Sequence, residues 1–497
     1  MMRQLLTKCS HVMYGILVYM ILAIALGSMV SKAFFALFLL PVIVYVIVKI
    51  FRGDMNWSER IPYRFLWWGI AVLGTLIMFY LAYEIRVQSL SWDWGKVIRS
   101  ASERVLTGSL ADEAYFARYP NNQIWYCVLV VFFSMIKRMM PAAELSEFYL
   151  FTIALGCLMV CLTILLFHHV AMLLWGEKKA FFAGALLWLC FPLFMWAPYA
   201  YTDTSGMLVL MLLLYIAVKE KKEENAPKKI VYGICFGVVA AFAYLLKVTV
   251  FIFAIAVMIT FFLQNRDWRR VGIGFLIAAI SFGGSTIVWQ AGMHQILNLE
   301  EQQYDQNELP LTHWVMMSMR YGGYVQEDVD YTMSFPSYQE KKEANIKEIR
   351  KRLQEKGPVG CMKLFFVDKQ IRTWGDAAFS GCDYLSREPE NPDGFWEKFV
   401  TQEGKWNWLL LLYLYLYYGI ILIGMLLGVV LPWRENKQGQ ELMAARVTML
   451  GIAVLMTIWE CNSRYIVLFL PLMVLLSCDG WRFLRGRFLC SQSERRK

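Results

Sequence analysis

Charged residues are scarce in this sequence. Asp, Glu, Lys and Arg make up 18% of its 497 residues, while hydrophobic residues make up 58%. A soluble domain has roughly 25% charged and 45–50% apolar residues. Histidine is also rare, with five residues, and neither an H-E-x-x-H nor a G-x-S-x-G motif occurs. The sequence is therefore atypical of a soluble protein, and it lacks the signatures of a zincin or of a serine hydrolase.

The sequence also lacks a disulfide framework and a groove for nucleic acid. The eleven cysteines lie mostly in apolar runs, and Cys361 and Cys382 alone do not make a disulfide framework, so we expect both to be unpaired. The net charge of +10 is not arranged as an interleaved basic and aromatic groove, and no nucleic-acid partner is expected. In an apolar chain, a net positive charge indicates basic cytoplasmic loops that contact anionic membrane lipids.

Long hydrophobic runs are plentiful instead. Twelve of them have about the length that crosses a bilayer. The first run follows MMRQLLTK without a cleavage site, which predicts an uncleaved span. We therefore predict an all-α integral membrane protein with about 12 transmembrane helices. The predicted spans are 12–30, 33–50, 64–86, 147–170, 180–197, 203–218, 230–246, 248–263, 271–292, 406–430, 444–460 and 464–480.

Basic connections between the runs predict the topology. If the basic connections and the basic C-terminal tail all face the cytoplasm, nearly every loop obeys the positive-inside rule and both termini are cytoplasmic. Two long extracytoplasmic loops follow, 87–146 and 293–405. The basic segments are KIFRGDMNWSERIPYR, WGEKKA, KEKKEENAPKK, QNRDWRR, PWRENKQGQELMAAR and RFLRGRFLCSQSERRK.

One apolar run, if counted as a span, would conflict with the predicted topology. Residues 121–140 are long enough to cross, but a crossing there would reverse every later loop. Their polar start and the basic Lys137 and Arg138 near their end fit a helix lying at the outer interface. In the second loop, the charged stretch 337–358 predicts a surface helix that stops near Gly357 and Pro358.

These boundaries divide the chain into four parts. An N-terminal two-helix hairpin covers 1–63, and a transmembrane module with the first outer loop covers 64–292. The second extracytoplasmic loop covers 293–405. The C-terminal transmembrane helices and the basic tail cover 406–497.

Ionisable residues gather at the predicted outer ends of the spans. They are Asp93, Asp203, Lys247, Glu460 and Arg464. A charge near membrane depth is costly, so such residues are by default functional candidates. Two bases can neutralise a phosphate, Arg464 as a fork and Lys247 as a point charge. Asp93, which stands between two tryptophans, is a candidate general base for a hydroxyl acceptor.

The same residues resemble the GT-C membrane glycosyltransferases, in particular a bacterial family 39-like, Gram-positive branch related to protein O-mannosyltransferases and the lipid A aminoarabinose transferase. The resemblance spans about residues 64–480. It rests on an acid after an early span and on the order of several short motifs. These are YFARYPNNQIW (115–125), YTDT (201–204), LPLTHWVMMSMRYGGYVQEDVDYT (309–332), TWGDAAFS (373–380) and the late Glu460, Arg464 and Tyr465.

This resemblance implies a GT-C fold, a polyprenyl-phosphate sugar donor and inversion at the anomeric carbon. It implies that Asp93 is the catalytic base and that Tyr119, Asn121 and Asn122 start a juxtamembrane helix. The family often has an acid pair at the first site, whereas here Trp94 follows Asp93. No metal ligands are therefore assigned, and a divalent cation stays possible as a cofactor.

Structural roles compete with these assignments. Asp93 and Asp203 each stand where an acid can cap a helix. Lys247 can extend to the headgroups, and Glu460 and Arg464, four residues apart, can pair on one helical face. His313 is equally compatible with an acceptor cleft and with an ordinary surface position.

The function expected from the sequence is an inverting glycosyltransferase of the cell membrane with an extracytoplasmic active site. Asp93 would be the base; Asp203, Lys247, Glu460, Arg464, Tyr119, Asn121, Asn122 and His313 would bind substrate. The acceptor would be a cell-envelope glycan, a glycolipid or a protein. A lipid-linked sugar flippase or transporter is the alternative, and a non-catalytic envelope scaffold is a third class. The sugar, the oligomeric state and the role of the N-terminal hairpin stay open.

Overall fold

The computed structural model describes residues 2–52, 62–88, 90–110, 112–265, 267–430 and 442–495. Helices make up almost all of this part of the chain, and its one β contact is an isolated bridge between Val87 and Pro389. The apolar helices are α1 (Met2–Lys32), α2 (Ala36–Arg52), α3 (Tyr63–Glu84), α7 (Leu145–Trp175), α8 (Glu177–Trp188), α9 (Phe191–Trp196), α10 (Thr202–Lys222), α11 (Ala226–Leu246), α12 (Val248–Gln264), α13 (Trp268–Leu297), α21 (Asn407–Val430), α22 (Met443–Ile458) and α23 (Leu470–Arg495), the last preceded by the 3₁₀ helix η5 (Ser463–Phe469).

The apolar helices pack into one bundle, and the chain runs back and forth between its two ends. Eight helical segments among the described residues are long and apolar enough to span a membrane, and α2, α12 and α22 contain shorter apolar stretches. The predicted span 180–197 is the exception, because it is divided into α8 and α9 at Leu189 and Cys190. The protein is thus an all-helical, multi-pass membrane protein, as predicted.

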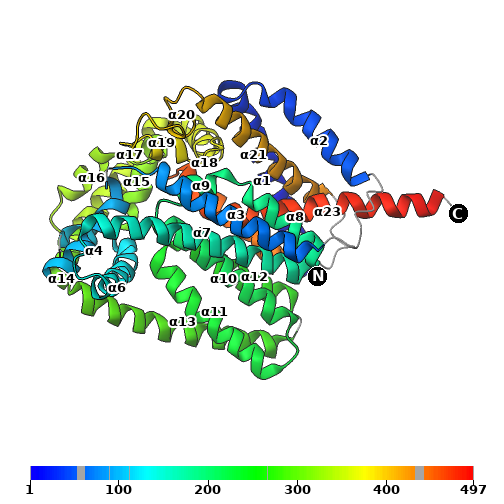
Figure 1. The fold of residues 1–497 in the computed structure, drawn as a ribbon. Coiled ribbons are helices and arrows are strands. Elements are labelled where there is room, and N and C mark those ends of the chain that lie inside the picture. Colours follow the sequence, from blue (N-terminus) through cyan, green and yellow to red (C-terminus); the bar gives the residue numbers. More distant parts are fainter. Residues whose placement is uncertain are drawn as a thin grey trace.

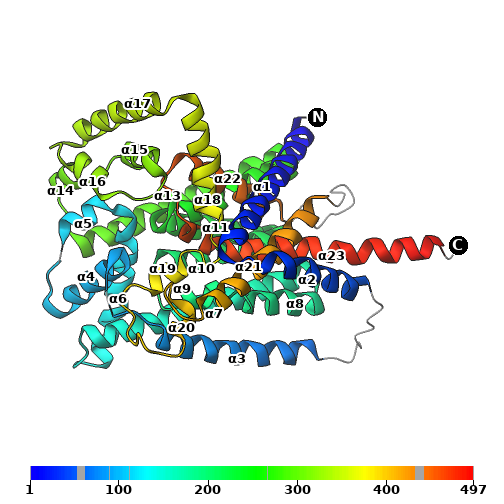
Figure 2. The same ribbon diagram turned by 90° about the horizontal axis from the view of Figure 1, so that it is seen from above.

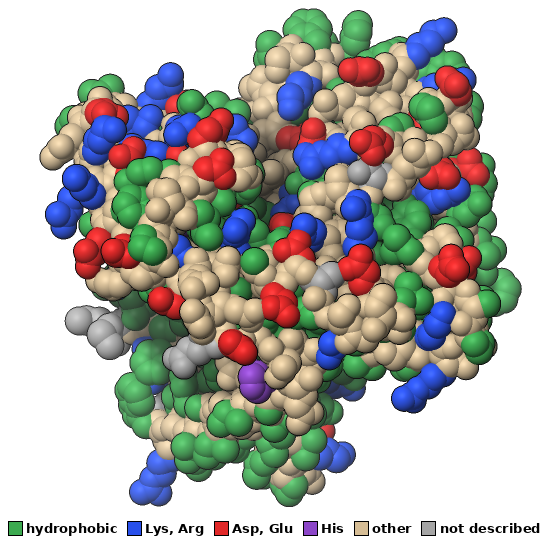
Figure 3. Space-filling model, turned by 90° about the vertical axis from the view of Figure 1, so that its left-hand side faces the viewer, with side chains coloured by type: hydrophobic (Ala, Val, Ile, Leu, Met, Phe, Trp, Pro, Cys, Tyr) green, Lys and Arg blue, Asp and Glu red, His purple; other side chains and the backbone are tan. Residues whose placement is uncertain are grey.

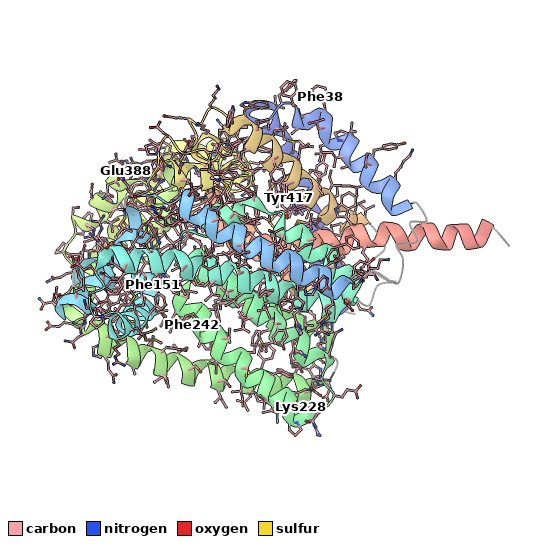
Figure 4. All side chains as sticks on the ribbon, in the orientation of Figure 1. Phe38, Phe151, Lys228, Phe242, Glu388 and Tyr417 are labelled. Carbon is pink, nitrogen blue, oxygen red and sulfur yellow. The ribbon has the colours of Figure 1, made fainter. Side chains whose placement is uncertain are left out.

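The bundle has two different ends (Figures 1 and 2). Both termini lie toward one end, which we call the terminal end. The two long segments 87–146 and 293–405 gather at the other, which we call the loop end. Figure 4 marks Glu388 toward the loop end and Lys228 at the terminal end. Residues 53–61 and 431–441, which form much of two basic connections, lie outside the described residues.

The loop end consists of short helices. The first segment contributes α4 (Trp92–Thr107), α5 (Glu113–Arg118), the 3₁₀ turn η1 (Pro120–Asn122) and α6 (Gln123–Met139). α6 coincides with the predicted interfacial helix; it packs on α4 beside the spans and is not among the candidate spans of the described chain. The second segment contributes α14 (Glu301–Asn307), α15 (Leu311–Tyr321), α16 (Gln326–Met333), α17 (Tyr338–Lys363), the π-helix η2 (Leu364–Asp368), α18 (Lys369–Trp374), α19 (Gly381–Leu385) and α20 (Glu397–Val400).

The second segment is folded around a buried carboxylate. Asp328 accepts hydrogen bonds from both terminal nitrogens of Arg352 at 2.8 Å, and Arg320 lies 2.9 Å from it. α17 changes direction at Gly357, whose φ of 62° is left-handed. The predicted stop of the charged helix near Gly357 and Pro358 is thus confirmed, although the helix resumes beyond it.

Close backbone packing holds α23 inside the bundle. A Cβ on Gly480 would lie 1.8 Å from the carbonyl oxygen of Gly424 and 2.6 Å from the amide nitrogen of Gly428, both on α21. Small residues that let helix backbones approach are a common basis of packing in membranes, where burial of apolar surface gives little driving force.

We therefore expect Gly480→Ala to destabilise the protein. Alanine is the better helix former by about 1 kcal/mol, but here its methyl group meets backbone and not a flexible side chain. A loss of about 1–3 kcal/mol is typical of overpacking. Thermal unfolding in detergent measures it. Gly284→Ala is the control, since nothing lies within 4 Å of a Cβ there, and equal melting temperatures for the two variants would contradict the packing argument.

Candidate functional site

Four elements distant in sequence meet at the loop end. The first turns of α10 and α4 carry Asp203 and Asp93. The junction of α11 and α12 carries Lys247, the segment between α22 and η5 carries Glu460, and the start of η5 carries Arg464. The structure thus places all five ionisable candidates at one end of the bundle, as the predicted topology requires.

Asp203 is the centre of this group. Its side chain is 1% exposed; Oδ1 pairs with Nζ of Lys247, and Oδ2 lies 3.6 Å from Nε of Arg464. One carboxylate thus faces two cations. Burial lowers the pKa of Lys247, and the charge of Asp203 opposes that shift.

Aromatic side chains surround the two cations. Nη1 of Arg464 donates a 2.8 Å hydrogen bond to the hydroxyl of Tyr384. The same guanidinium lies 5.0 Å from the ring centre of Trp92 and 5.3 Å from that of Tyr465, while Lys247 lies 5.1 Å from Tyr465. Cations over aromatic faces are stabilised by the ring quadrupole, more so where water is excluded.

Glu460 does not pair with Arg464 on a helical face. α22 ends at Ile458 and η5 starts at Ser463, so an unwound segment separates the two residues. Glu460 instead accepts a 3.1 Å hydrogen bond from the hydroxyl of Tyr465. The alternative of an i,i+4 pair is therefore not what the described residues form, because that spacing rule holds only within a continuous helix. Burial raises the pKa of Glu460, which favours the neutral acid.

The unwound segment is fastened to the second loop. The amide of Cys461 donates a 2.7 Å hydrogen bond to the carbonyl of Gly322, at the end of α15. One helical turn earlier, the hydroxyl of Ser318 donates to the carbonyl of Ile458 at 2.9 Å. The path of the chain around Glu460 therefore depends on α15.

Asp93 ends a chain of hydrogen bonds. Tyr115 donates to Oδ1 of Asp93 at 2.8 Å, the amide of Asn122 donates to the oxygen of Tyr115 at 2.7 Å, and Tyr201 donates to Oδ1 of Asn122 at 2.7 Å. Burial raises the pKa of Tyr115 and Tyr201, so both hydroxyls keep their protons. Asp93 is half-buried, and no hydrogen bond to its Oδ2 is found within the described ranges. One oxygen is thus held in place and the other is available to accept a proton.

Two local features fix the start of α4. Trp92 has a left-handed backbone with a φ of 52°, which is uncommon for a bulky residue. A Cβ on Gly95 would lie 2.0 Å from the carbonyl atoms of Leu90, so only glycine fits. Asp93 stands inside the first turn after Ser91, and it makes no capping hydrogen bond.

Trp92 and Tyr201 join the acid to the cations. Their rings meet edge to face with centres 5.2 Å apart, and Trp92 also meets Tyr384 at 4.8 Å. Tyr201 is two residues from Asp203 and hydrogen-bonds toward Asp93 through Asn122. The indole of Trp92, the residue before Asp93, therefore lies next to the guanidinium of Arg464. Figure 3 views the loop end, where acidic and basic side chains are interspersed.

Three predicted substrate residues have different surroundings. The hydroxyl of Tyr119 is hydrogen-bonded to Tyr324, and its ring packs on that of Tyr115 at 5.1 Å, so it borders the Asp93 chain. Asn121 is exposed and donates to Asn122 at 3.2 Å. His313 is fully buried, and its Nδ1 lies 2.7 Å from the hydroxyl of Thr332. Among the described residues, no hydrogen bond or ring contact joins His313 directly to the group around Asp203, and its position is not that of a surface residue.

Sequence reasoning missed the role of the tyrosines. Tyr115 and Tyr201 lie in the motifs named above, but only the structure shows that both are hydrogen-bonded to Asn122 and that Tyr115 also binds Asp93. Tyr384 comes from α19 in the second loop, and no local pattern marks it. Its contact with Arg464 depends on how that loop folds back over the bundle.

The carboxylates are not arranged as metal ligands. Among the residues that the structure describes, no group of three or more His, Cys, Asp or Glu side chains is close enough to hold a metal ion. Both oxygens of Asp203 face cationic side chains. The residues therefore do not fit a metal shared by Asp93 and Asp203.

A further buried acid lies beside this region. Glu397 on α20 is 2% exposed, and neither of its carboxyl oxygens has a hydrogen-bond partner within the described chain. Burial raises its pKa from the ordinary 4.5 to about 7. Its charge acts on the hydroxyl of Tyr199, whose ring meets that of Trp94 with centres 5.0 Å apart.

The apolar bundle and the charged site at its loop end define a helical, multi-pass integral membrane protein. Residues 11–482 match a family described as conserved hypothetical integral membrane proteins, and the chain belongs to that family. No curated protein sequence matches the chain.

One similar solved structure is ArnT from Cupriavidus metallidurans bound to undecaprenyl phosphate. The TM-score is 0.37 and the sequence identity 15%, over 84% of this chain and 77% of the other.

We expect Asp203→Asn to destabilise the protein strongly. The substitution leaves Lys247 and Arg464 close together without a countercharge, and breaking a buried ion pair costs about 3–5 kcal/mol. Unfolding in detergent measures the loss. Asp383→Asn is the control, because Asp383 pairs with Arg387 at the same end but is 47% exposed, where such pairs contribute about 0–1 kcal/mol. Equal losses would contradict a central role for Asp203.

Glu397 predicts a pH dependence. The folded state holds this proton up to about pH 7, whereas the unfolded chain releases it near 4.5. Stability therefore falls as pH rises between these values, by up to about 3 kcal/mol, and is then level. Glu397→Gln removes this decline in a series of unfolding curves, while the exposed control Glu403→Gln keeps it. A decline of the same size in both variants would rule out Glu397 as its source.

Proposed function

We propose that this protein is an inverting glycosyltransferase of GT-C type, in the Gram-positive, family 39-like branch. It would transfer a sugar from a polyprenyl-phosphate donor to a cell-envelope glycan, glycolipid or protein. The observation that carries the proposal is that Trp92 and Tyr201 link Asp93, which has one free carboxylate oxygen, to the buried pair Lys247 and Arg464. The topology from basic loops favours an extracytoplasmic loop end.

The cations would receive the leaving group. Lys247 and Arg464 share the single countercharge of Asp203, and burial favours the neutral form of Glu460. The pair thus carries positive charge that is not fully balanced. When the bond between the anomeric carbon and the phosphate oxygen breaks, negative charge grows on that oxygen, and cations held in a dry site stabilise it.

Asp93 would act at the acceptor. Its Oδ2 would take the proton of the acceptor hydroxyl while that oxygen bonds to the anomeric carbon, and polyprenyl phosphate would leave on the opposite face. Tyr115 and Asn122 would hold the carboxylate still. Trp92, which is packed between the two halves, offers an aromatic face against which a sugar can stack.

The substitution Asp93→Asn tests the proposal. Purified protein in nanodiscs receives undecaprenyl phosphate carrying labelled glucose, mannose or galactose, and release of undecaprenyl phosphate is measured. Loss of general-base assistance should lower the rate about 10²- to 10⁴-fold. Asp112→Asn is the matched control, because Asp112 lies in the same loop, exposed and paired with Lys96.

Other outcomes point elsewhere. A rate that Asp93→Asn leaves unchanged would remove Asp93 as the base. Movement of the labelled lipid across vesicles without release of undecaprenyl phosphate would favour a flippase. Arg464→Lys, which keeps the charge but loses the fork, should weaken donor binding more than it slows turnover. Whether a divalent cation contributes is answered by adding EDTA to the same assay.

A further inference from the structure

A cavity lies far from the candidate site. It has a volume of about 800 Å³, is partly open to the outside, and is lined mainly by α10, α11, α12 and α13 at the terminal end. Asp203 and Glu220 stand at opposite ends of α10, 17 residues apart, which at about 1.5 Å per residue is about 25 Å. The cavity is therefore not part of the site around Asp203.

The inner wall of the cavity is apolar. Side chains from all four helices form it, among them Leu214, Phe236, Phe261 and Ile277. Its volume falls in the range of about 300–1,000 Å³ in which proteins bury ligands. In a membrane protein, an apolar wall between spans suits a hydrocarbon chain.

The outer rim is predominantly basic. Five basic residues line it, against the three acids Glu220, Glu224 and Asp267; the bases are Lys221, Lys222, Lys229, Arg269 and Arg270. Arg270 lies 3.7 Å from Glu220. Lys229 and Arg269 make no salt bridge with any residue of the described ranges. The rim thus keeps positive charge where the spans end, which is the level of lipid headgroups.

We propose that this cavity binds an anionic glycerophospholipid. Its phosphate would lie between Lys229 and Arg269 and an acyl chain along the apolar wall. Free phosphate would not use that wall, and a zwitterionic lipid would gain little from the excess positive charge. A polyprenyl phosphate is the weaker occupant, because the cations proposed to receive its phosphate lie at the opposite end.

The bound phospholipid would stabilise the packing of α13 on the bundle. Only Val271, Met293 and Leu297 of this 30-residue helix are buried. α13 packs mainly on α11. A hydrocarbon chain in the cavity would add to the contacts that α13 makes with the bundle, and a bound lipid stabilises the folded state by mass action.

Native mass spectrometry of delipidated protein tests the proposal. The protein is titrated with phosphatidylglycerol and with phosphatidylcholine of identical chains. We expect wild type to bind phosphatidylglycerol about tenfold more tightly, and the double variant K229Q/R269Q to lose most of that preference, because it removes two positive charges from the level of the headgroup. The control K8Q/K228Q removes two exposed charges that do not line the cavity. Ala217→Phe, which places a large side chain in the cavity, should weaken the binding of both lipids.

Several results would overturn the proposal. They are equal binding of the two lipids by wild type, equal preference in the two double variants, or displacement of phosphatidylglycerol by an equimolar amount of undecaprenyl phosphate. If K229Q/R269Q does not fold, the preference of wild type must still shrink as salt is raised, because exposed charges are screened. Lipid binding is measured without turnover, so this test succeeds or fails independently of the glycosyltransferase assay.

Discussion

The carboxylate of Asp203 is the interaction on which the loop end depends. It sits at the start of α10, one of the more buried helices, and faces cations from two other parts of the chain. Two buried cations repel each other and lose hydration, so they can stay together only with a shared countercharge. The junction of α11 and α12 and the start of η5 are therefore drawn to the same point. The aromatic rings around Arg464 complete a setting with little access for water.

A second framework, built from uncharged groups, meets the first. The hydrogen bonds from Tyr201 through Asn122 and Tyr115 to Asp93 link α10 to the first loop without placing another charge inside. The acid is fixed on one oxygen only. A rigid carboxylate next to a partly compensated cation pair is an arrangement suited to moving a proton on one side of a reacting centre and holding an anion on the other.

Most of the fold could be predicted because hydrophobic runs and basic loops are direct consequences of the bilayer. The same constraint brought Asp93, Asp203 and Lys247 to one end, since charges avoid the interior of spans. What could not be predicted depends on long-range folding. The sequence predicts separate spans, 444–460 and 464–480, on the two sides of the break between α22 and η5, but not that Glu460 bonds to Tyr465 there. Tyr384 and Glu397 come from a loop whose path no periodicity encodes, and His313 is buried by helices that only the folded loop creates.

The backbone hydrogen bond from Cys461 to Gly322 has a mechanical consequence. It anchors the strip of chain that carries Glu460, and immediately afterwards Arg464, to the last turn of α15. A ligand that displaces α15 would therefore also displace the guanidinium of Arg464. In the proposed reaction, binding of the acceptor over the loops would therefore be coupled through α15 to release of the phosphate.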